Sequence, residues 1–233
     1  RAGAKLIGEM LGKKRVVMVT LNNDFGKSLA AGFKEQAKNF GVSILAEYDY
    51  SIKDREFGPI ISKIKADKPD AIYASGYFFT AGPMVSQMRA AGLNQPIVGQ
   101  EGYDSQKFIE IAGKASEGVM ITTSLDRDSS SPETKDFISG FARKAGYPAD
   151  MVAASGHTAL LVIADALKRA SSNDASALRD AISKTSLSAS TGKISFNALG
   201  EVQKDVQVQV VKDGNWHHHS VISDAVLLAP PSK

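Results

Sequence analysis

The sequence predicts an α/β fold built on a doubly wound parallel sheet. In the first half of the 233-residue chain, short runs of β-branched residues alternate with stretches of about 10–15 residues in which apolar residues recur at helical spacing. This alternation is the pattern of βαβ units. Connections between parallel strands of one sheet are right-handed, and this rule makes the sheet doubly wound. A hydrophobic content of 43% in a chain of this length is enough to bury a substantial core without disulfides or metals.

The first half of the chain supplies the repeating units. The first strand is a nearly continuous apolar run around Val17, which indicates burial on both faces, and Gly41 and Gly92 mark helix ends. Ile61 and Ile64 belong to the apolar stripe of the helix expected at 57–66. The expected strands are 14–20, 42–48, 71–74, 96–99 and 118–122. The expected helices are 1–13, 27–40, 57–66, 80–91 and 105–112.

The second half of the chain has a different texture. A Ser/Asp-rich connection at 124–131 is typical of a crossing between domains, and three helical stretches follow it without intervening strands. These helices are expected at 132–145, 151–170 and 175–184. A short strand is expected at 194–196, and alternating valines around an Asp213-Gly214 turn predict a terminal hairpin.

Composition excludes several classes of protein. The 28 basic and 25 acidic residues are interspersed, so the chain lacks the basic stripe of a nucleic-acid-binding protein. Without cysteine there can be no disulfide scaffold, thiolate zinc site or cysteine nucleophile. No window approaches the roughly 18 uninterrupted apolar residues of a membrane span, so no direct span is predicted.

Motifs for catalysis and cofactor binding are also missing. Gly26 opens a segment like the end of a phosphate-binding loop, but Leu21 stands where the first glycine is needed. Ser62 begins an S-x-x-K match in the middle of a helix, which indicates a solvated face. Residues 217–219 are consecutive histidines that alternate faces of a strand, and His157 is expected to be packed or water-facing. We therefore predict no catalytic residue, metal or cofactor.

The positive functional signal is positional. Ligands of open parallel sheets bind beyond the carboxyl ends of the strands, near the point where the strand order reverses. The loops expected there carry Asn23, Phe25, Tyr77, Glu101 and Tyr103. Aromatic and apolar walls with one acidic anchor suit a small ligand that has a cationic end and an apolar body. Glu101 is the sharpest candidate, because glycines on either side allow the backbone to approach a ligand closely.

These same loops carry a family resemblance that runs essentially from end to end. The first strand with its Asn-Asp-Phe-Gly loop, the strand leading to Tyr77, and the Gly-Gln-Glu-Gly segment resemble landmarks of type I periplasmic solute-binding proteins. The last of these is similar to the leucine/isoleucine/valine-binding branch of ABC-transporter proteins. The matching segments are 16–26, 71–77, 99–102, 117–119 and 192–196.

The resemblance implies roles for individual residues. Glu101 would accept hydrogen bonds from the α-ammonium of an amino acid, and Tyr77 would contact the polar end of the ligand. Phe25 stands where well-known members have tyrosine, which makes the wall more apolar. Asn197 replaces a usual aspartate in a turn, and His157 falls where many members carry tyrosine.

The resemblance also implies an architecture and a function. Residues 1–124 and 205–233 would form the C-terminal lobe of a bilobal protein, and residues 125–204 would return to the N-terminal lobe. Much of that N-terminal lobe is expected to precede Arg1, together with a signal peptide that is removed. The protein would be a periplasmic, non-enzymatic component of an ABC importer. It would capture a branched-chain or similar apolar amino acid by hinge closure and deliver it to a membrane permease.

Two other classes of function stay open. The same fold could serve as the ligand-sensing domain of a receptor or amide-type regulator, which a membrane anchor or signalling module in flanking sequence would favour. An enzyme on a doubly wound sheet is the third hypothesis, and turnover that Glu101→Gln abolishes without loss of binding would favour it.

Overall fold

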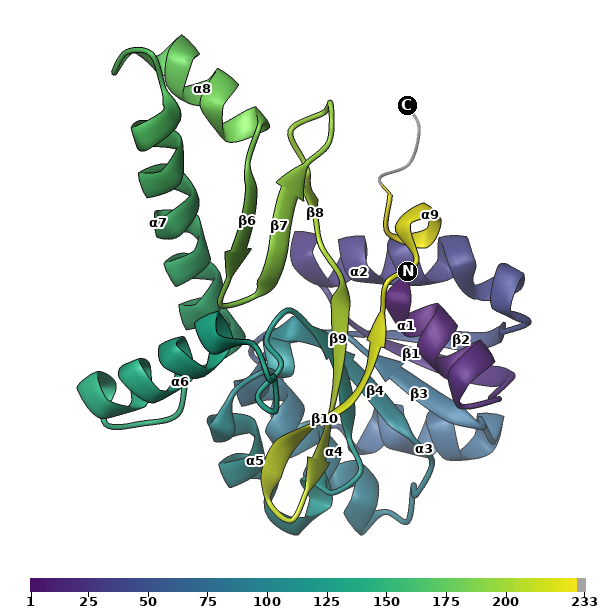
Figure 1. Cartoon of the computed structure of the whole chain (residues 1–233). Coiled ribbons are helices and arrows are strands. Elements are labelled where there is room, and N and C mark those ends of the chain that lie inside the picture. The colour runs from purple at the N-terminus through teal and green to yellow at the C-terminus, as the bar shows by residue number, and fades with distance from the viewer. Residues whose placement is uncertain (230–233) are drawn as a thin grey trace. The chain divides into compact units, whose positions relative to one another are not determined.

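A computed structural model describes residues 1–229, which divide into two compact units. Unit 1 comprises Arg1–Thr123 and Val208–His219, and unit 2 comprises Ser124–Gln207 together with the residues from Ser220 onwards. The chain passes between the units after Thr123, after Gln207 and after His219 (Figure 1).

The main sheet has seven strands in the order β10-β9-β5-β4-β3-β1-β2. Strands β2, β1, β3, β4 and β5 pair in parallel, with Val19 opposite Ala74 where β1 lies beside β3. The strands are β1 (Arg15–Leu21), β2 (Ser43–Tyr50), β3 (Ala71–Ala74), β4 (Ile97–Gln100), β5 (Met120–Thr123), β9 (Val206–Lys212) and β10 (Asn215–Ile222). The predicted parallel sheet is confirmed.

Helices cover both faces of this sheet in unit 1. Helices α1 and α2 lie on one face and α3, α4 and α5 on the other (Figure 1), because right-handed crossovers leave β1 toward β2 in one direction and return toward β3 in the other. The helices are α1 (Ala2–Lys5), α2 (Asp24–Ala37), α3 (Gly58–Asp67), α4 (Phe78–Ala90) and α5 (Gln106–Ala112). Shorter turns are the π-helical η1 (Leu6–Met10) and the 3₁₀ segments η2 (Lys38–Phe40), η3 (Glu101–Tyr103) and η4 (Gly113–Ser116).

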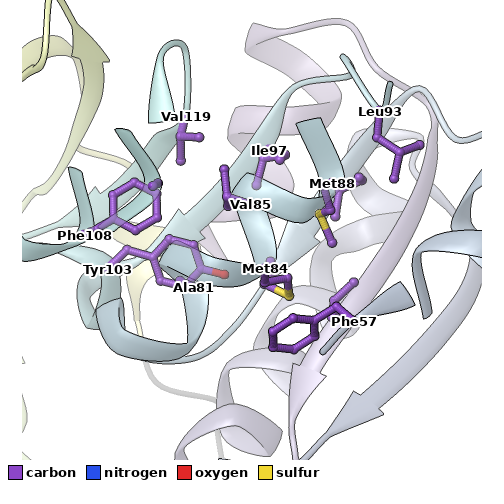
Figure 2. Packing of buried hydrophobic residues seen from close by; sticks show 14 of the residues in the cluster. Phe57, Ala81, Met84, Val85, Met88, Leu93, Ile97, Tyr103, Phe108 and Val119 are labelled. Carbon is purple, nitrogen blue, oxygen red and sulfur yellow. The ribbon is translucent and has the colours of Figure 1, made fainter. Parts of the chain in front are cut away.

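The core of unit 1 lies between the sheet and helices α3 to α5. Met84, Val85 and Met88 of α4 are fully buried against strand residues such as Ile97, and Phe108 of α5 closes one end (Figure 2). Burying one such side chain contributes roughly 1.5–3 kcal/mol. The sheet is therefore a rigid base for the loops at its edges.

In the part of the chain that the structure describes, unit 2 contains helices α6 to α9 and a small antiparallel sheet in the order β6-β7-β8. Two small hydrophobic clusters hold it, one around Phe137 and one in which Val162 of α7 packs with Ile194. Its elements are α6 (Pro132–Ala145), α7 (Met151–Arg169), α8 (Ala175–Ser183), β6 (Ser186–Ala189), β7 (Gly192–Phe196), β8 (Val202–Gln203) and α9 (Ala225–Leu228). Strands β6 and β8 were not expected from the sequence.

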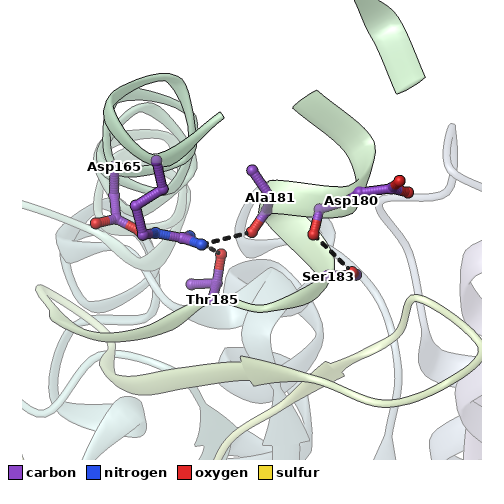
Figure 3. Close-up of polar contacts among 6 residues, drawn as sticks. Asp165, Asp180, Ala181, Ser183 and Thr185 are labelled. Carbon is purple, nitrogen blue, oxygen red and sulfur yellow. Dashed lines mark hydrogen bonds and ion pairs between the residues drawn. The ribbon is translucent and has the colours of Figure 1, made fainter. Parts of the chain in front are cut away.

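Arg169 at the end of α7 ties this helix to α8. Its guanidinium donates to the Asp165 carboxylate at 2.6 and 2.9 Å, to the Ala181 carbonyl at 2.9 Å and to the Thr185 hydroxyl at 3.3 Å. The Ala181 carbonyl belongs to the last turn of α8 (Figure 3), and it accepts a second hydrogen bond from the Lys184 amide at 3.2 Å. One arginine therefore serves as the C-terminal cap of a neighbouring helix.

Helix α7 is half exposed in unit 2. Val152 and Leu160 are 69% and 68% exposed, whereas Val162 and Ala166 are buried. Among the residues that the structure describes, α7 alone is long and apolar enough to cross a membrane by length and composition, a test that core helices of soluble proteins also pass. The prediction of no direct membrane span uses a different criterion, because it requires a long uninterrupted run of apolar residues, which the sequence lacks.

Candidate functional site

The predicted loops lie at the carboxyl ends of strands in the main sheet. Strands β1, β3 and β4 are neighbours in the sheet and run in parallel, so the loops that follow them all leave from the same end of the sheet, at the carboxyl ends of the strands. The strand order reverses between β1 and β3, because β1 is followed by β2 on one side and β3 lies on the other. This is the position at which open α/β sheets bind ligands.

Asn23 shapes the loop after β1. Its backbone is extended and its Oδ1 accepts a hydrogen bond from the Gly26 amide at 2.8 Å, so it is the N-cap of α2. Gly26 lies against the end of the strand, where a Cβ would come within 2.1 Å of the Leu21 carbonyl oxygen. Helix α2 consequently begins at Asp24, three residues earlier than predicted, and its first turn carries Phe25.

Phe25 and Tyr77 form an aromatic wall across the switch point. Their rings stack at 5.0 Å between centroids with an angle of 7°, and Tyr77 stacks on Phe79 at 5.6 Å and 16°. The Arg55 guanidinium carbon lies 5.9 Å from the Phe79 centroid. All three rings are partly exposed, so they can contact an apolar ligand group.

The buried Tyr50 side chain holds the loop between β3 and α4 in place. The Tyr50 hydroxyl donates to the Ser75 carbonyl at 2.8 Å and lies 3.1 Å from Thr80 Oγ1. Burial raises the pKa of Tyr50 to about 12, so its hydroxyl stays protonated as a donor. Gly76 adopts φ 155°, and a Cβ there would lie 1.9 Å from the Tyr50 hydroxyl oxygen. The tight packing under Gly76 places Tyr77 at the surface.

Glu101 follows β4 directly and begins η3, where it is half buried. The pKa of the Tyr73 phenol is raised by burial and, to a smaller extent, by the negative charge of Glu101. An acidic group in this position can accept hydrogen bonds from a cationic ligand.

Tyr103 is a core residue, contrary to its expected place in the ligand wall. It is fully buried, and its ring stacks on Phe108 at 5.3 Å (Figure 2). The reason is Gly99, where a Cβ would come within 2.5 Å of the Tyr103 ring. The glycine leaves room for the ring to fold under β4. Burial also raises the pKa of the Tyr103 hydroxyl.

Gln100 is the functional candidate that the sequence prediction missed. Its side chain is buried between the loops that carry Tyr77 and Glu101 and hydrogen-bonds to both. One signal was available, because a glutamine that ends a short apolar strand requires buried partners for its amide.

The four histidines belong to other elements, α7 and β10. His157 packs on Phe137 with ring centroids 4.9 Å apart, and its Nδ1 lies 3.1 Å from Ser190 Oγ, as expected for a packed histidine. Residues 217–219 belong to β10, an edge strand of the main sheet. Within residues 1–229 no group of three or more His, Asp or Glu side chains is placed to hold a metal ion.

Comparisons with known proteins agree on one family. The family model described as periplasmic binding protein matches residues 1–215. The leucine-, isoleucine-, valine-, threonine- and alanine-binding protein of Pseudomonas aeruginosa is 25% identical over 201 residues, which are 85% of this chain and 53% of that protein. The Leu/Ile/Val-binding protein of Citrobacter freundii is 24% identical over 222 residues, 95% of this chain and 59% of that protein. The chain thus spans little more than half the length of these relatives.

Solved structures give the same fold. The leucine-binding protein LivK of Thermotoga maritima has a TM-score of 0.86 and 30% identity, covering 96% of this chain and 64% of that chain. The branched-chain amino acid protein LivJ of Streptococcus pneumoniae, solved with isoleucine, has a TM-score of 0.84 and 25% identity, covering 94% and 63%.

Proposed function

Because this chain belongs to the periplasmic binding protein family, we propose that it is part of the solute-binding component of an ABC importer for amino acids. The observation that carries the proposal is the pairing of an aromatic wall with Glu101 at the switch point of the sheet. Relatives named for binding leucine, isoleucine and valine support a branched-chain or similarly apolar ligand.

We assign the cationic end of the ligand to Glu101. A carboxylate that accepts a hydrogen bond from an α-ammonium contributes about 1.5–3 kcal/mol. Phe25 and Tyr77 would contact the rest of the ligand, and Asn23 would hold the turn that presents Phe25. Tyr103 would act indirectly, because its ring packs against Gly99 in β4, the strand that ends just before Glu101.

Transport would work by hinge closure between two lobes. In this proposal residues 1–124 and 205–233 belong to one lobe and residues 125–204 to the other, and a ligand that contacts both lobes stabilises the closed state. A membrane permease would recognise that state in the periplasm. Residues outside this chain would hold the ligand's carboxylate.

A thermal-shift screen of the protein at its full natural length against the twenty amino acids tests this function. A ligand that binds only the folded state raises the melting temperature by mass action. We expect the largest increases with leucine, isoleucine and valine. A shift with some other class of solute and with none of the amino acids would contradict the role of Glu101.

The family is one of solute-binding proteins, and we propose that the bound amino acid is not altered. Chromatography of the ligand after prolonged incubation should recover it unchanged. Turnover that Glu101→Gln abolishes while binding survives would establish an enzyme instead.

A further inference from the structure

Gln100 connects the two loops of the proposed site. It is the last residue of β4 and is only 1% exposed, and the neighbouring strand β3 ends at Ala74, just before the other loop. Its Nε2 donates to the Gly76 carbonyl at 2.9 Å. Its Oε1 accepts from the Gly102 amide at 2.7 Å. One side-chain amide therefore bonds the backbone next to Tyr77 and the backbone next to Glu101.

The two loops also touch directly where Gln100 holds them. A Cβ on Gly102 would lie 2.1 Å from the Gly76 carbonyl oxygen, and therefore only glycine permits this approach without movement. Gly102 therefore lies against the same Gly76 carbonyl that accepts the hydrogen bond from Gln100 Nε2. The spacing between the loops is thus set by the Gln100 amide together with the missing side chain of Gly102.

The loop after β3 has a separate support of its own. Tyr50 and Thr80 hydrogen-bond the backbone at Ser75 and Tyr77, so this loop is anchored to the core without Gln100. Through Gln100, the backbone that carries Glu101 is joined to that anchored loop. Buried hydrogen bonds of this kind orient a binding group before the ligand arrives, which reduces the entropy lost on binding.

We propose that Gln100 is a positioning residue, which fixes the carboxylate of Glu101 relative to the aromatic wall of Phe25 and Tyr77. The role of Gln100 in ligand binding rests on the proposed function, whereas the linkage between the two loops can be measured without any ligand.

The linkage is tested first by amide hydrogen exchange in the full-length protein without ligand. Gln100→Leu removes both hydrogen bonds, and we expect exchange at residues 101–104 to quicken at least about tenfold, the loss of roughly one buried hydrogen bond. Ser116→Ala is the control, because Ser116 is a buried residue that donates to the Gly113 carbonyl just before β5, at the opposite end of the strands. Unchanged exchange at 101–104 in a folded Gln100→Leu protein would overturn the proposal.

A second variant reaches the same contact without touching Gln100. Gly102→Ala inserts a methyl group where the loops meet and should separate them, with faster exchange at 101–104 as well. Gly58→Ala adds the same methyl group where no atom lies within 4 Å and should leave exchange in both loops unchanged. Equal behaviour of the two alanine variants would contradict the proposal even if Gln100→Leu does not fold.

Binding of L-leucine, followed by titration calorimetry, separates positioning from general loss of stability. We expect Gln100→Leu to weaken binding about tenfold or more in the parent protein and far less in a Glu101→Gln background, because residues that act through one another are not additive. Additive losses would overturn the positioning role. If the parent protein bound neither L-leucine nor any other amino acid, the proposed function would fail, whereas the exchange experiment would still decide the linkage.

Discussion

Glu101 and Phe25 make different contributions to the proposed site, and these can be separated by truncation. Glu101→Ala removes a charged acceptor that contributes about 1.5–3 kcal/mol per hydrogen bond, and should weaken L-leucine binding roughly 10- to 150-fold. Phe25→Ala removes part of an exposed wall and should cost less. Titration calorimetry of both variants at full natural length checks the order, and equal losses would contradict it.

Tyr50 makes stability depend on alkaline pH. Burial raises its pKa from 10.0 to about 12, so the folded state holds the phenol proton more tightly than the unfolded state does. This stabilisation is complete below pH 10 and is lost as the pH rises from about 10 to 12, by roughly 3 kcal/mol at most.

Urea denaturation at several pH values checks this dependence. The free energy of unfolding should fall less steeply between pH 10 and 12 in Tyr50→Phe than in the parent protein. Tyr147→Phe, at a ring 60% exposed, is the control and should keep the parent slope. Equal slopes for the parent and Tyr50→Phe would show that Tyr50 does not supply this dependence.

At the scale of single residues, the sequence located the loops better than the side chains within them. The positions of Glu101, Tyr77 and Phe25 follow from their place after strands, which the pattern of apolar runs predicts. The burial of Tyr103 and the linkage through Gln100 depend on the space left by Gly99 and Gly102. The space beside a glycine depends on tertiary packing, and it produces no periodic pattern in the sequence.

Arg169 is a test of how two helices of unit 2 are joined. Arg169→Ala removes the hydrogen bonds that join α7 to the Ala181 carbonyl and the Thr185 hydroxyl, and should lower the free energy of unfolding by about 1–3 kcal/mol. Arg169→Lys should recover little of this, because an ammonium cannot reproduce the fork of the guanidinium. Arg179→Ala, at a side chain 76% exposed, should change stability by less than about 0.5 kcal/mol in the same urea titrations. Loss of equal size at both arginines would contradict the capping role.

At the scale of elements, prediction succeeded where one physical signal dominated. Strand β1 is a continuous buried run, and its bounds differ from the prediction by a single residue at each end. Strand β6 was missed because Ser186, Ser188 and Ala189 have little β propensity, and its pairing with β7 is what makes it a strand. Helix α2 was predicted to start late because the capping role of Asn23 was not considered.

At the scale of the whole molecule, hinge closure predicts a change in size. The radius of gyration of the full-length protein, measured by small-angle X-ray scattering, should decrease when L-leucine is added. Glu101→Ala at the same ligand concentration should keep the larger value. A radius that does not change under saturating ligand would contradict closure, even with binding intact.

The overall class of fold was within reach of the sequence because alternation of strands and helices is a local pattern. The parallel pairing of the strands follows from that alternation, and the right-handed crossover rule makes the sheet doubly wound. The points at which the chain changes unit were harder to place, since β9 and β10 are continuous strands that each cross a boundary. The assignment of the units to two lobes of a binding protein stays a prediction.

The position of β9 beside β5 has a consequence for biosynthesis. The Val211 amide donates a hydrogen bond to the Val119 carbonyl, yet all of α6, α7 and α8 are translated between these two residues. The sheet of unit 1 thus cannot be completed on the ribosome until nearly the whole chain has emerged, and β5 waits during that time with an unpaired edge. Contacts of such long sequence separation slow folding and prolong exposure to aggregation. We therefore expect chaperones that shield strand edges to increase the yield of this protein more than that of a protein with contiguous domains.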